Sequence, residues 1–296
     1  MSAIETMQVV PPSNSTIGAE ILGIDVKNLQ PGSEEVQAIR DAIYRYRLVV
    51  FRDQKMHEEE YVQFARAIGR PQVYFQTNYH HPQHPEIFVS SNVLEDGKKV
   101  GVSGTGHYWH TDCSFEPKPL SLTSVYPQLF PDDSRGTMYT DMVDIYRRLP
   151  AELKEYVDGV TATHAGQLRY KVQASDIDQS LKQLLERINA EVPPVKHPAV
   201  ITHPVTGEQS LYLNSGFTVA LDGLTHEENQ KRLAELFEFI ERPEHAHRHL
   251  WRKGDLIIWD NRTLNHMSSP VKPGQQNKMY RIGIYDDLPF YEGIES

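Results

Sequence analysis

The chain has 296 residues, a formal net charge of −10 at pH 7 and a single cysteine, Cys113. The acidic balance argues against nucleic-acid partners, which bind basic surfaces, and one cysteine excludes an intrachain disulfide, so we expect a reducing, cytoplasmic environment. No apolar run is long enough to cross a bilayer and no secretory signal is visible, so we expect a soluble chain without a membrane partner.

The first part of the chain predicts alternating helices and strands. Residues 1–16 are rich in Ser, Thr and Pro, which predicts a flexible segment ahead of a single domain over residues 17–296. Apolar residues at helical spacing predict one helix over residues 34–47 and a second that ends at Gly69. The apolar run 48–51 between them predicts a buried strand.

The rest of the chain is richer in strand patterns. From about residue 84 to residue 140, short β-like runs alternate with turns. A helical insert is predicted near residues 141–190, and a capping box at Thr225 begins a helix over residues 225–241. Strand patterns return after residue 255. Many short strands with helical insertions predict a mostly β fold with a double-stranded β-helix core, which is jelly-roll or cupin-like.

Two imidazoles and one carboxylate form a candidate metal site. His110 and Asp112 are two residues apart, so on a strand both side chains point to the same face, and His266 ends a later predicted strand. Two nitrogen donors and a carboxylate occupy half an octahedron, a pattern typical of ferrous iron. Arg281 follows fifteen residues later and offers a planar clamp for a carboxylate. His-x-Asp alone would favour ordinary hydrogen-bonded histidines, but the full set in this order favours the metal site.

Several motifs follow one another through the chain: Gly18-Ala19-Glu20, Phe64-Ala65-Arg66-Ala67-Ile68-Gly69, Trp109-His110-Thr111-Asp112, Arg135-Gly136-Thr137, Leu149-Pro150, His164, Trp251-Arg252-Lys253-Gly254-Asp255 and Trp259-Asp260-Asn261-Arg262. With these motifs the chain resembles the TauD/TfdA family of iron(II)- and 2-oxoglutarate-dependent dioxygenases over almost its whole length. The resemblance implies that His110, Asp112 and His266 are catalytic and bind Fe(II), with 2-oxoglutarate and dioxygen as co-substrates. It also implies that Thr137 and Arg281 hold the distal carboxylate of 2-oxoglutarate. Members of the family often form dimers or tetramers, so the resemblance is compatible with a homo-oligomer.

One branch of the family is a closer match. The sulfonate- and aryloxyacetate-cleaving members carry a second arginine eleven residues after the last histidine, where this chain has Asn277. Four features instead resemble the isonitrile-forming branch: Tyr79-His80-His81-Pro82, Glu86-Ile87-Phe88-Val89-Ser90-Ser91, Arg135-Gly136-Thr137 and Lys171. Members of that branch oxidatively decarboxylate N-carboxymethyl-3-amino acids to 3-isocyano acids. The resemblance implies the same isonitrile-forming reaction, in secondary metabolism.

The resemblance also implies a substrate site for a small-molecule carboxylate. Lys171 and Tyr74 would contact the substrate carboxylates, with Tyr79 beside them. Phe75 and Cys113 stand where the branch has tyrosines, so we expect them to line the site and the substrate to have a different side chain. From the residues alone, Lys171 would be a solvated lysine and Cys113 a small buried filler.

Three other functions remain open. One is a hydroxylase, or another enzyme that oxidises a C–H bond or cleaves a carbon–heteroatom bond of a different small carboxylate. A halogenase would need an open position in place of Asp112, and a non-catalytic ligand-binding barrel would not need the triad.

Two groups of histidines, at residues 80–84 and 245–249, offer a zinc alternative. They lack the cysteines and the helical spacing of zinc motifs, so we expect surface loops and an edge strand there.

Overall fold

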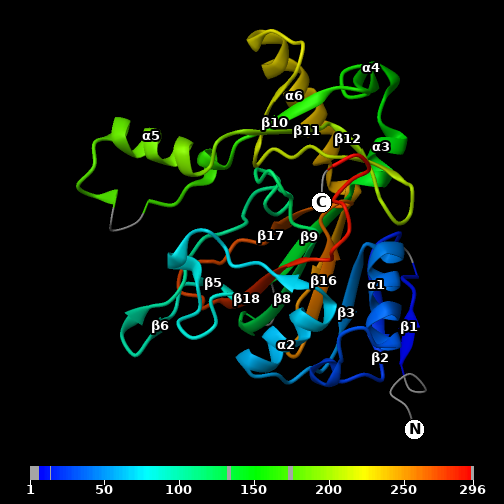
Figure 1. The fold of residues 1–296 in the computed structure, drawn as a ribbon, viewed down its shortest axis with the longest axis vertical. Helices are drawn as coiled ribbons and strands as arrows, with labels where there is room; N and C mark the ends of the chain where they lie inside the picture. Colours follow the sequence, from blue (N-terminus) through cyan, green and yellow to red (C-terminus); the bar gives the residue numbers. More distant parts are fainter. Residues whose placement is uncertain (1–6, 14, 132–134, 173–175, 295–296) are drawn as a thin grey trace.

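The computed structural model describes residues 7–13, 15–131, 135–172 and 176–294. Its largest element is an eight-stranded sheet with the strand order β1-β2-β3-β16-β8-β18-β4, in which β5 also pairs with β18 (Figure 1). The strands of this sheet are β1 (Gln8–Val10), β2 (Ala19–Leu22), β3 (Leu48–Phe51), β4 (Arg70–Pro71), β5 (Phe88–Ser91), β8 (Leu122–Leu129), β16 (Leu256–Asp260) and β18 (Lys278–Tyr285). The β2–β3 pair is parallel and the other pairs are antiparallel.

A three-stranded antiparallel sheet forms the second layer. Its order is β15-β9-β17, with β9 (Gly136–Asp141) between β15 (Ala246–Leu250) and β17 (Leu264–Ser268). Buried side chains from both sheets, among them Val125, Tyr139 and Trp259, belong to one apolar cluster. Because the two sheets share this core, the predicted mostly β jelly-roll architecture is confirmed.

The helices cover the strands in two groups. The predicted helices at 34–47 and before Gly69 are α1 (Glu34–Tyr46) and α2 (Glu58–Ile68), and both pack in the apolar cluster of the large sheet. A second cluster gathers α3 (Met142–Arg148), α4 (Ala151–Lys154) and α6 (His226–Ile240). In Figure 1, α5 (Leu181–Glu191) extends away from the two sheets.

Short elements complete the described fold. The small sheets contain β10 (Thr161–His164), β11 (Val195–Pro198) and β14 (Thr218–Leu221), then β12 (Val200–Thr202) with β13 (Gln209–Leu211), and β6 (Leu94–Glu95) with β7 (Lys98–Lys99). The 3-10 helices are η2 (Val26–Asn28), η3 (Thr77–Tyr79), η4 (Gly166–Arg169) and η6 (Pro243–His245). Within the described ranges, no helix has the length and apolar character needed to cross a membrane.

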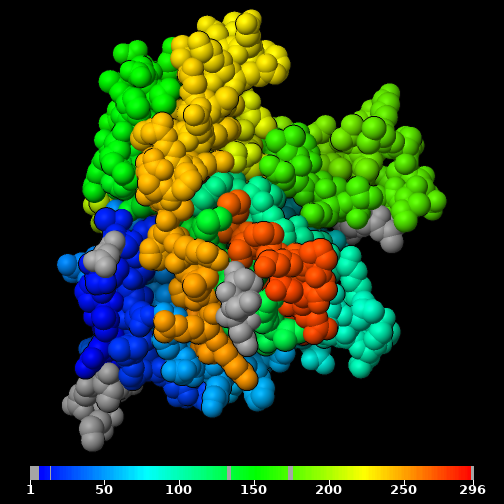
Figure 2. Space-filling model, turned by 180° about the vertical axis from the view of Figure 1, so that it is seen from behind, coloured from blue at the N-terminus to red at the C-terminus, as the bar shows by residue number. Residues whose placement is uncertain are grey.

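Sequence-distant segments lie side by side in this fold. Figure 2 shows blue N-terminal atoms next to orange atoms from the C-terminal part of the chain, and β3 pairs with β16 about two hundred residues later. One expectation differs: residues 1–16 predict a flexible segment, but Gln8–Val10 forms β1 and pairs with β2. Residues 1–6 and 14 lie outside the described ranges.

Candidate metal centre and adjoining cavities

His110 and His266 meet across an isolated antiparallel β-bridge. The His110 amide donates to the His266 carbonyl at 3.0 Å, and the His266 amide donates to the His110 carbonyl at 2.8 Å. His266 lies in the middle of β17, and the ring centroids of the two histidines are 4.1 Å apart. The backbone pairing therefore brings together two imidazoles that are far apart in the sequence.

Asp112 completes the cluster from a turn. The expectation that His110 and Asp112 share a strand is wrong: only the bridge at His110 has strand pairing, and a turn begins at Asp112. Cys113, the next residue, has a positive φ of 54°, which ends the extended path. Even so, the Asp112 carboxylate lies 3.6 Å from His110 Nε2 and 3.7 Å from His266 Nε2.

A chain of hydrogen bonds holds the Asp112 carboxylate. The Thr123 hydroxyl donates to Asp112 Oδ2 at 2.8 Å, and the Asn261 amide donates to that hydroxyl at 2.9 Å. The Trp259 indole then donates to the Asn261 side-chain oxygen at 3.0 Å. Because Thr123, Asn261 and Trp259 are buried, this chain fixes one carboxylate oxygen from within the core.

Two of the three donor groups, those of His266 and Asp112, are held in the form that a metal ion requires. His110 Nδ1 lies 2.8 Å from the Tyr108 carbonyl and donates to it, which leaves Nε2 as the ring nitrogen on the side of Asp112. Burial, with His110 nearby, lowers the pKa of His266 to about 3, so this ring stays neutral. Burial alone would raise the pKa of Asp112, but the Arg281 guanidinium beside it outweighs burial and holds the pKa well below its usual range.

The geometry of these three residues fits a metal ion. One ligand atom from each of His110, Asp112 and His266 can be chosen so that all three lie within 4.8 Å of one another. No other group of this kind occurs among the residues that the structure describes. The histidines at residues 80–84 and 245–249, which offered a zinc alternative, therefore form no such cluster among the described residues. His249 is buried and pairs with Asp255 at 3.1 Å, so this histidine is not at the surface as expected.

Arg281 lies beside the cluster on β18. Its Nη1 donates to Asp112 Oδ1 at 3.0 Å, and its guanidinium lies over the Phe88 ring, 4.5 Å from the centroid. Its Nε is buried and has no hydrogen-bond partner among the described residues. Arg281 therefore has donor capacity that the surrounding protein does not fill.

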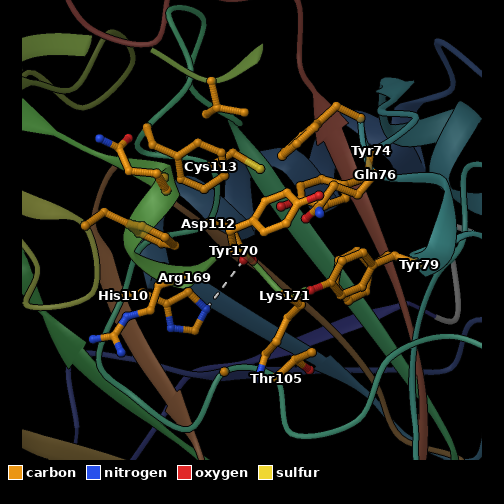
Figure 3. Close-up of a pocket in the computed structure, with 18 of the residues that line it drawn as sticks. Tyr74, Gln76, Tyr79, Thr105, His110, Asp112, Cys113, Arg169, Tyr170 and Lys171 are labelled. Carbon is orange, nitrogen blue, oxygen red and sulfur yellow. Dashed lines mark ion pairs between the residues drawn. The ribbon is translucent and has the colours of Figure 1, made fainter. Parts of the chain in front are cut away.

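The cavities on the two sides of the cluster share six of their lining residues: Phe88, Thr105, Gly106, His110, Asp112 and Arg281. The first cavity has a volume of about 690 Å³ and is shown in Figure 3, where His110, Asp112 and Lys171 are labelled. Its other walls are mostly aromatic: Tyr74, Phe75, Tyr79, Tyr108, Phe115, Tyr170 and Phe217. Arg169 and Lys171 add positive charge at this cavity.

The second cavity, of about 590 Å³, contains Thr137, Arg135 and His266. The Thr137 hydroxyl accepts a hydrogen bond from the Trp251 indole at 3.2 Å. Arg135 is buried, and its Nε donates to the Asn277 side-chain oxygen at 2.9 Å. Burial lowers the pKa of Arg135 to about 10, and no carboxylate of the described residues pairs with it. Its Nη1 donates to the Ser269 carbonyl, so this guanidinium is a buried, hydrogen-bonded cation whose charge no carboxylate of the described residues neutralises.

The structure brings all five expected substrate-site residues to the first cavity: Tyr74, Phe75, Tyr79, Cys113 and Lys171. Lys171 is exposed and donates to the Gly104 carbonyl at 3.2 Å, so its ammonium is held at the wall. Tyr79 is buried and stacks with Phe88 at a centroid distance of 4.3 Å. Cys113 is also buried, and burial, with Glu116 nearby, raises the pKa of its thiol.

Three cavity residues, Tyr108, Arg135 and Arg169, are not among the site residues that the sequence predicts. Arg135 is recognisable only as part of a motif, although Asn277, at the position of a missing arginine, is its hydrogen-bond partner. Arg169 lies over the Tyr108 ring, 4.0 Å from the centroid, and both line the first cavity. Tyr108 and Arg169 each stand two residues from a predicted site residue, His110 and Lys171. This proximity in the sequence is too weak a signal to assign them a role.

Comparisons with known proteins agree with this geometry. The family model described as taurine catabolism dioxygenase TauD, TfdA family matches residues 8–282. Pentalenolactone F synthase of Streptomyces arenae is 28% identical over 289 residues, which cover 95% of this chain and 96% of that protein. The alpha-ketoglutarate-dependent 2,4-dichlorophenoxyacetate dioxygenase of Cupriavidus pinatubonensis is 29% identical over 289 residues, with 94% and 98% covered. A solved structure of a taurine dioxygenase from Burkholderia xenovorans has a TM-score of 0.76 and 28% identity, with 98% and 95% covered.

Proposed function

Because the chain belongs to the TauD/TfdA family of iron(II)- and 2-oxoglutarate-dependent dioxygenases, it is an oxidoreductase of this class, and we propose that it converts an N-carboxymethyl-3-amino acid into a 3-isocyano acid. One observation carries the choice of substrate. Three cations line the first cavity: Arg281 beside Asp112, Arg169 over the Tyr108 ring and Lys171 beside Gly104. With Arg281 assigned to 2-oxoglutarate, Arg169 and Lys171 remain, and two cations suit a substrate with two carboxylates.

In this proposal His110, Asp112 and His266 hold the iron. Iron together with 2-oxoglutarate and dioxygen supplies the oxidising power. The chain places the substrate: Lys171 and Tyr74 contact its carboxylates, and Tyr79 and Cys113 line the cavity around it. The aromatic walls exclude water from the reacting carbon, which protects the reaction from side products.

The co-substrate occupies the second cavity. Thr137 and Arg281 contact the distal carboxylate of 2-oxoglutarate, as the family resemblance implies, and Arg135 adds a third contact. Arg135 supports this assignment because it is a buried cation without a carboxylate partner among the described residues. Arg281 borders both cavities, so it stands between the co-substrate and the substrate.

The proposed reaction is a four-electron oxidation of the substrate. The nitrogen and the N-methylene carbon lose their hydrogens, the carboxyl group leaves as carbon dioxide, and the carbon remains as the isonitrile carbon. Two molecules each of 2-oxoglutarate and dioxygen are consumed. They yield two molecules of succinate, two of water and two further molecules of carbon dioxide.

The test is a product assay by mass spectrometry. Protein, ferrous iron, ascorbate, 2-oxoglutarate and N-carboxymethyl-3-aminobutanoic acid are mixed in air, and both isonitrile and succinate are counted. We expect an isonitrile with about two succinates per product. An Asp112→Ala variant, in which an iron ligand is removed, is the control and should give neither. Succinate without isonitrile would reject this substrate and keep the dioxygenase.

A second candidate is a hydroxylase, or a C–heteroatom cleaving enzyme, that acts on a different small carboxylate. Phe75 and Cys113 favour it, because neither offers the phenol that the isonitrile-forming branch has at these positions. One relative is described as acting on 2,4-dichlorophenoxyacetate, an aromatic monocarboxylate. The product mass separates the two candidates, because hydroxylation adds one oxygen and isonitrile formation removes the carboxyl group.

A further inference from the structure

The second cavity is walled off from solvent. None of the described residues that line it is exposed, and the least buried of them, such as Ser90, Thr105 and Ser268, are half-buried. A ligand therefore reaches the second cavity, and leaves it, through a neighbouring cavity. The first cavity is one such neighbour, because the two share six lining residues.

A third cavity is the other neighbour. It has about 710 Å³ of empty space, and it shares Ser90 and Arg135 with the second cavity but no residue with the first. Seven of its lining residues are exposed: Asn92, Ser103, Gly104, His107, Lys272, Pro273 and Gly274. The third cavity therefore connects the second cavity with solvent without passing through the first.

The loop over residues 103–107 stands between the first and third cavities. Thr105 lines the first cavity, and its neighbour Gly104 lines the third. Lys171 donates to the Gly104 carbonyl at 3.2 Å, and the Thr105 hydroxyl lies 2.6 Å from the Ser90 hydroxyl. Figure 3 shows Thr105 and Lys171 together at the first cavity. These contacts hold the loop in place, so a ligand in the first cavity leaves the third one open.

The chemistry of the third cavity suits a dicarboxylate. Its described lining contains no acidic residue, although the chain has a formal net charge of −10. Serine hydroxyls and asparagine amides offer hydrogen bonds, and Lys272 adds positive charge at the exposed end. A cation at the open end of a cavity attracts anions and raises their rate of entry.

Arg135 forms the inner end of this path. Its Nε donates to the Asn277 side-chain oxygen and its Nη1 to the Ser269 carbonyl, while Nη2 has no hydrogen-bond partner among the described residues. The guanidinium lines the second and third cavities, whereas Thr137 lines only the second. A carboxylate that enters through the third cavity therefore meets Arg135 before it reaches Thr137.

We propose that the third cavity is the route by which 2-oxoglutarate enters and succinate leaves while the substrate stays in the first cavity. Ser103 and Lys272 line the outer end of this route, and Arg135 lines the inner end. The inference rests on the proposed function, which consumes two molecules of 2-oxoglutarate for each product. The first succinate is then exchanged for the second 2-oxoglutarate without release of the half-oxidised substrate.

Binding kinetics test the route without turnover. 2-Oxoglutarate is mixed with the iron(II)-loaded protein in a stopped-flow instrument in the absence of air, and its association and dissociation are followed by the visible absorption of the complex. Ser103→Trp obstructs the outer end, so both rates should fall about ten-fold or more. The dissociation constant should stay the same, because an obstacle on a path slows both directions equally. Unchanged affinity also shows that the variant is folded.

A second variant changes charge instead of size. Lys272→Glu should slow association about three-fold or more at low ionic strength, and the difference should shrink as salt is added. Val205 is 50% exposed, Lys231 is exposed on α6, and neither lines any of the three cavities. Val205→Trp and Lys231→Glu therefore control for the added ring and for the change of charge, and both should keep the rates of the unmodified protein.

Addition of the substrate first gives an independent result. Protein saturated with N-carboxymethyl-3-aminobutanoic acid should take up 2-oxoglutarate at a rate within about two-fold of the substrate-free rate. Uptake that stops as the substrate saturates would show entry through the first cavity and overturn the inference.

A failure of the route is distinguishable from a failure of the proposed function. The two variants are measured without substrate, so slower exchange in Ser103→Trp and Lys272→Glu supports the route even if the product assay gives no isonitrile. If isonitrile forms and both variants exchange 2-oxoglutarate as fast as the unmodified protein, the reaction stands and the route is wrong.

Discussion

Thr123 connects the metal cluster to the core, because its hydroxyl donates to Asp112 Oδ2 and accepts from Asn261. Outer contacts of this kind orient a metal ligand, and their loss commonly weakens metal binding about ten- to hundred-fold. We therefore expect Thr123→Val to bind ferrous iron about ten- to hundred-fold more weakly in an anaerobic competition titration with a chromophoric chelator. Thr123→Ser keeps the hydroxyl and should bind as the unmodified protein does. Unchanged affinity in Thr123→Val would remove this residue from the metal site.

Arg135 and Arg281 can be compared directly as partners of 2-oxoglutarate. A hydrogen bond to a charged group contributes about 1.5–3 kcal/mol, so Arg135→Gln should raise the dissociation constant for 2-oxoglutarate about ten- to hundred-fold. Arg281→Gln should raise it as well, but it should also weaken binding of the substrate carboxylate, because Arg281 borders both cavities. Calorimetric titration of each ligand measures both effects. Normal 2-oxoglutarate binding by Arg135→Gln would exclude Arg135 from the clamp.

The sequence predicts the residues of the metal cluster better than it predicts their local structure. His110, Asp112 and His266 converge as expected, and their role as iron ligands remains a prediction. The strand expected around Asp112 is a turn, because Cys113 takes a positive φ that no residue pattern announces. Arg135 shows a second limit: the sequence shows where the arginines are, but not which of them is buried without a carboxylate partner among the residues that the structure describes.

At the level of elements, α6 depends on its N-terminal capping box. The Thr225 side chain accepts from the Glu228 amide, and the Glu228 carboxylate accepts from the Thr225 amide at 2.8 Å. Replacing such a cap by alanine costs about 1 kcal/mol, so Thr225→Ala should lower the free energy of unfolding by about that amount in a urea titration. Thr225→Ser retains the oxygen and should recover most of the loss. An unchanged unfolding midpoint in Thr225→Ala would show that packing alone holds the helix end.

Other element boundaries show what local patterns leave out. The helical insert predicted near residues 141–190 carries no internal boundaries, although Ser180 and Gln183 form the capping box at which α5 begins with Leu181. Leu181 is 71% exposed, so this apolar side chain does not pack into the core. The strand β1 is not predicted, because three residues are too few to show the alternation of apolar and polar side chains that marks a strand. Its pairing with β2 stabilises it in the fold.

At the level of the whole molecule, the two-sheet architecture follows from strand patterns, but the pairing does not. In the large sheet β16 lies between β3 and β8, and β18 lies on the other side of β8. These neighbouring strands are far apart in the sequence, so local sequence patterns do not determine which of them pair. The pairing depends on the core that the two sheets share. The cavities share this origin, because their walls combine loops, strands and η4 from across the chain.

The pH dependence of stability is a property of the whole fold, and His164 contributes a measurable part. His164 is fully buried on β10, and burial, with His197 nearby, lowers its pKa to about 3. Below about pH 6.5 the unfolded chain binds a proton at this residue and the folded chain does not, so stability falls as the pH falls. By about pH 5 this amounts to about 2 kcal/mol from His164.

Urea unfolding of the protein and of His164→Gln at about pH 7 and pH 5 measures this contribution. Between these pH values, the unmodified protein should lose about 2 kcal/mol more than the variant, because glutamine does not titrate. Between about pH 7 and pH 8 the two should differ by only about 0.2 kcal/mol, since the residue is already about three-quarters neutral at pH 7 in the unfolded chain and neutral in the folded one. Equal losses on acidification would mean that the buried His164 takes up its proton within the folded protein, against the burial that the fold imposes on it.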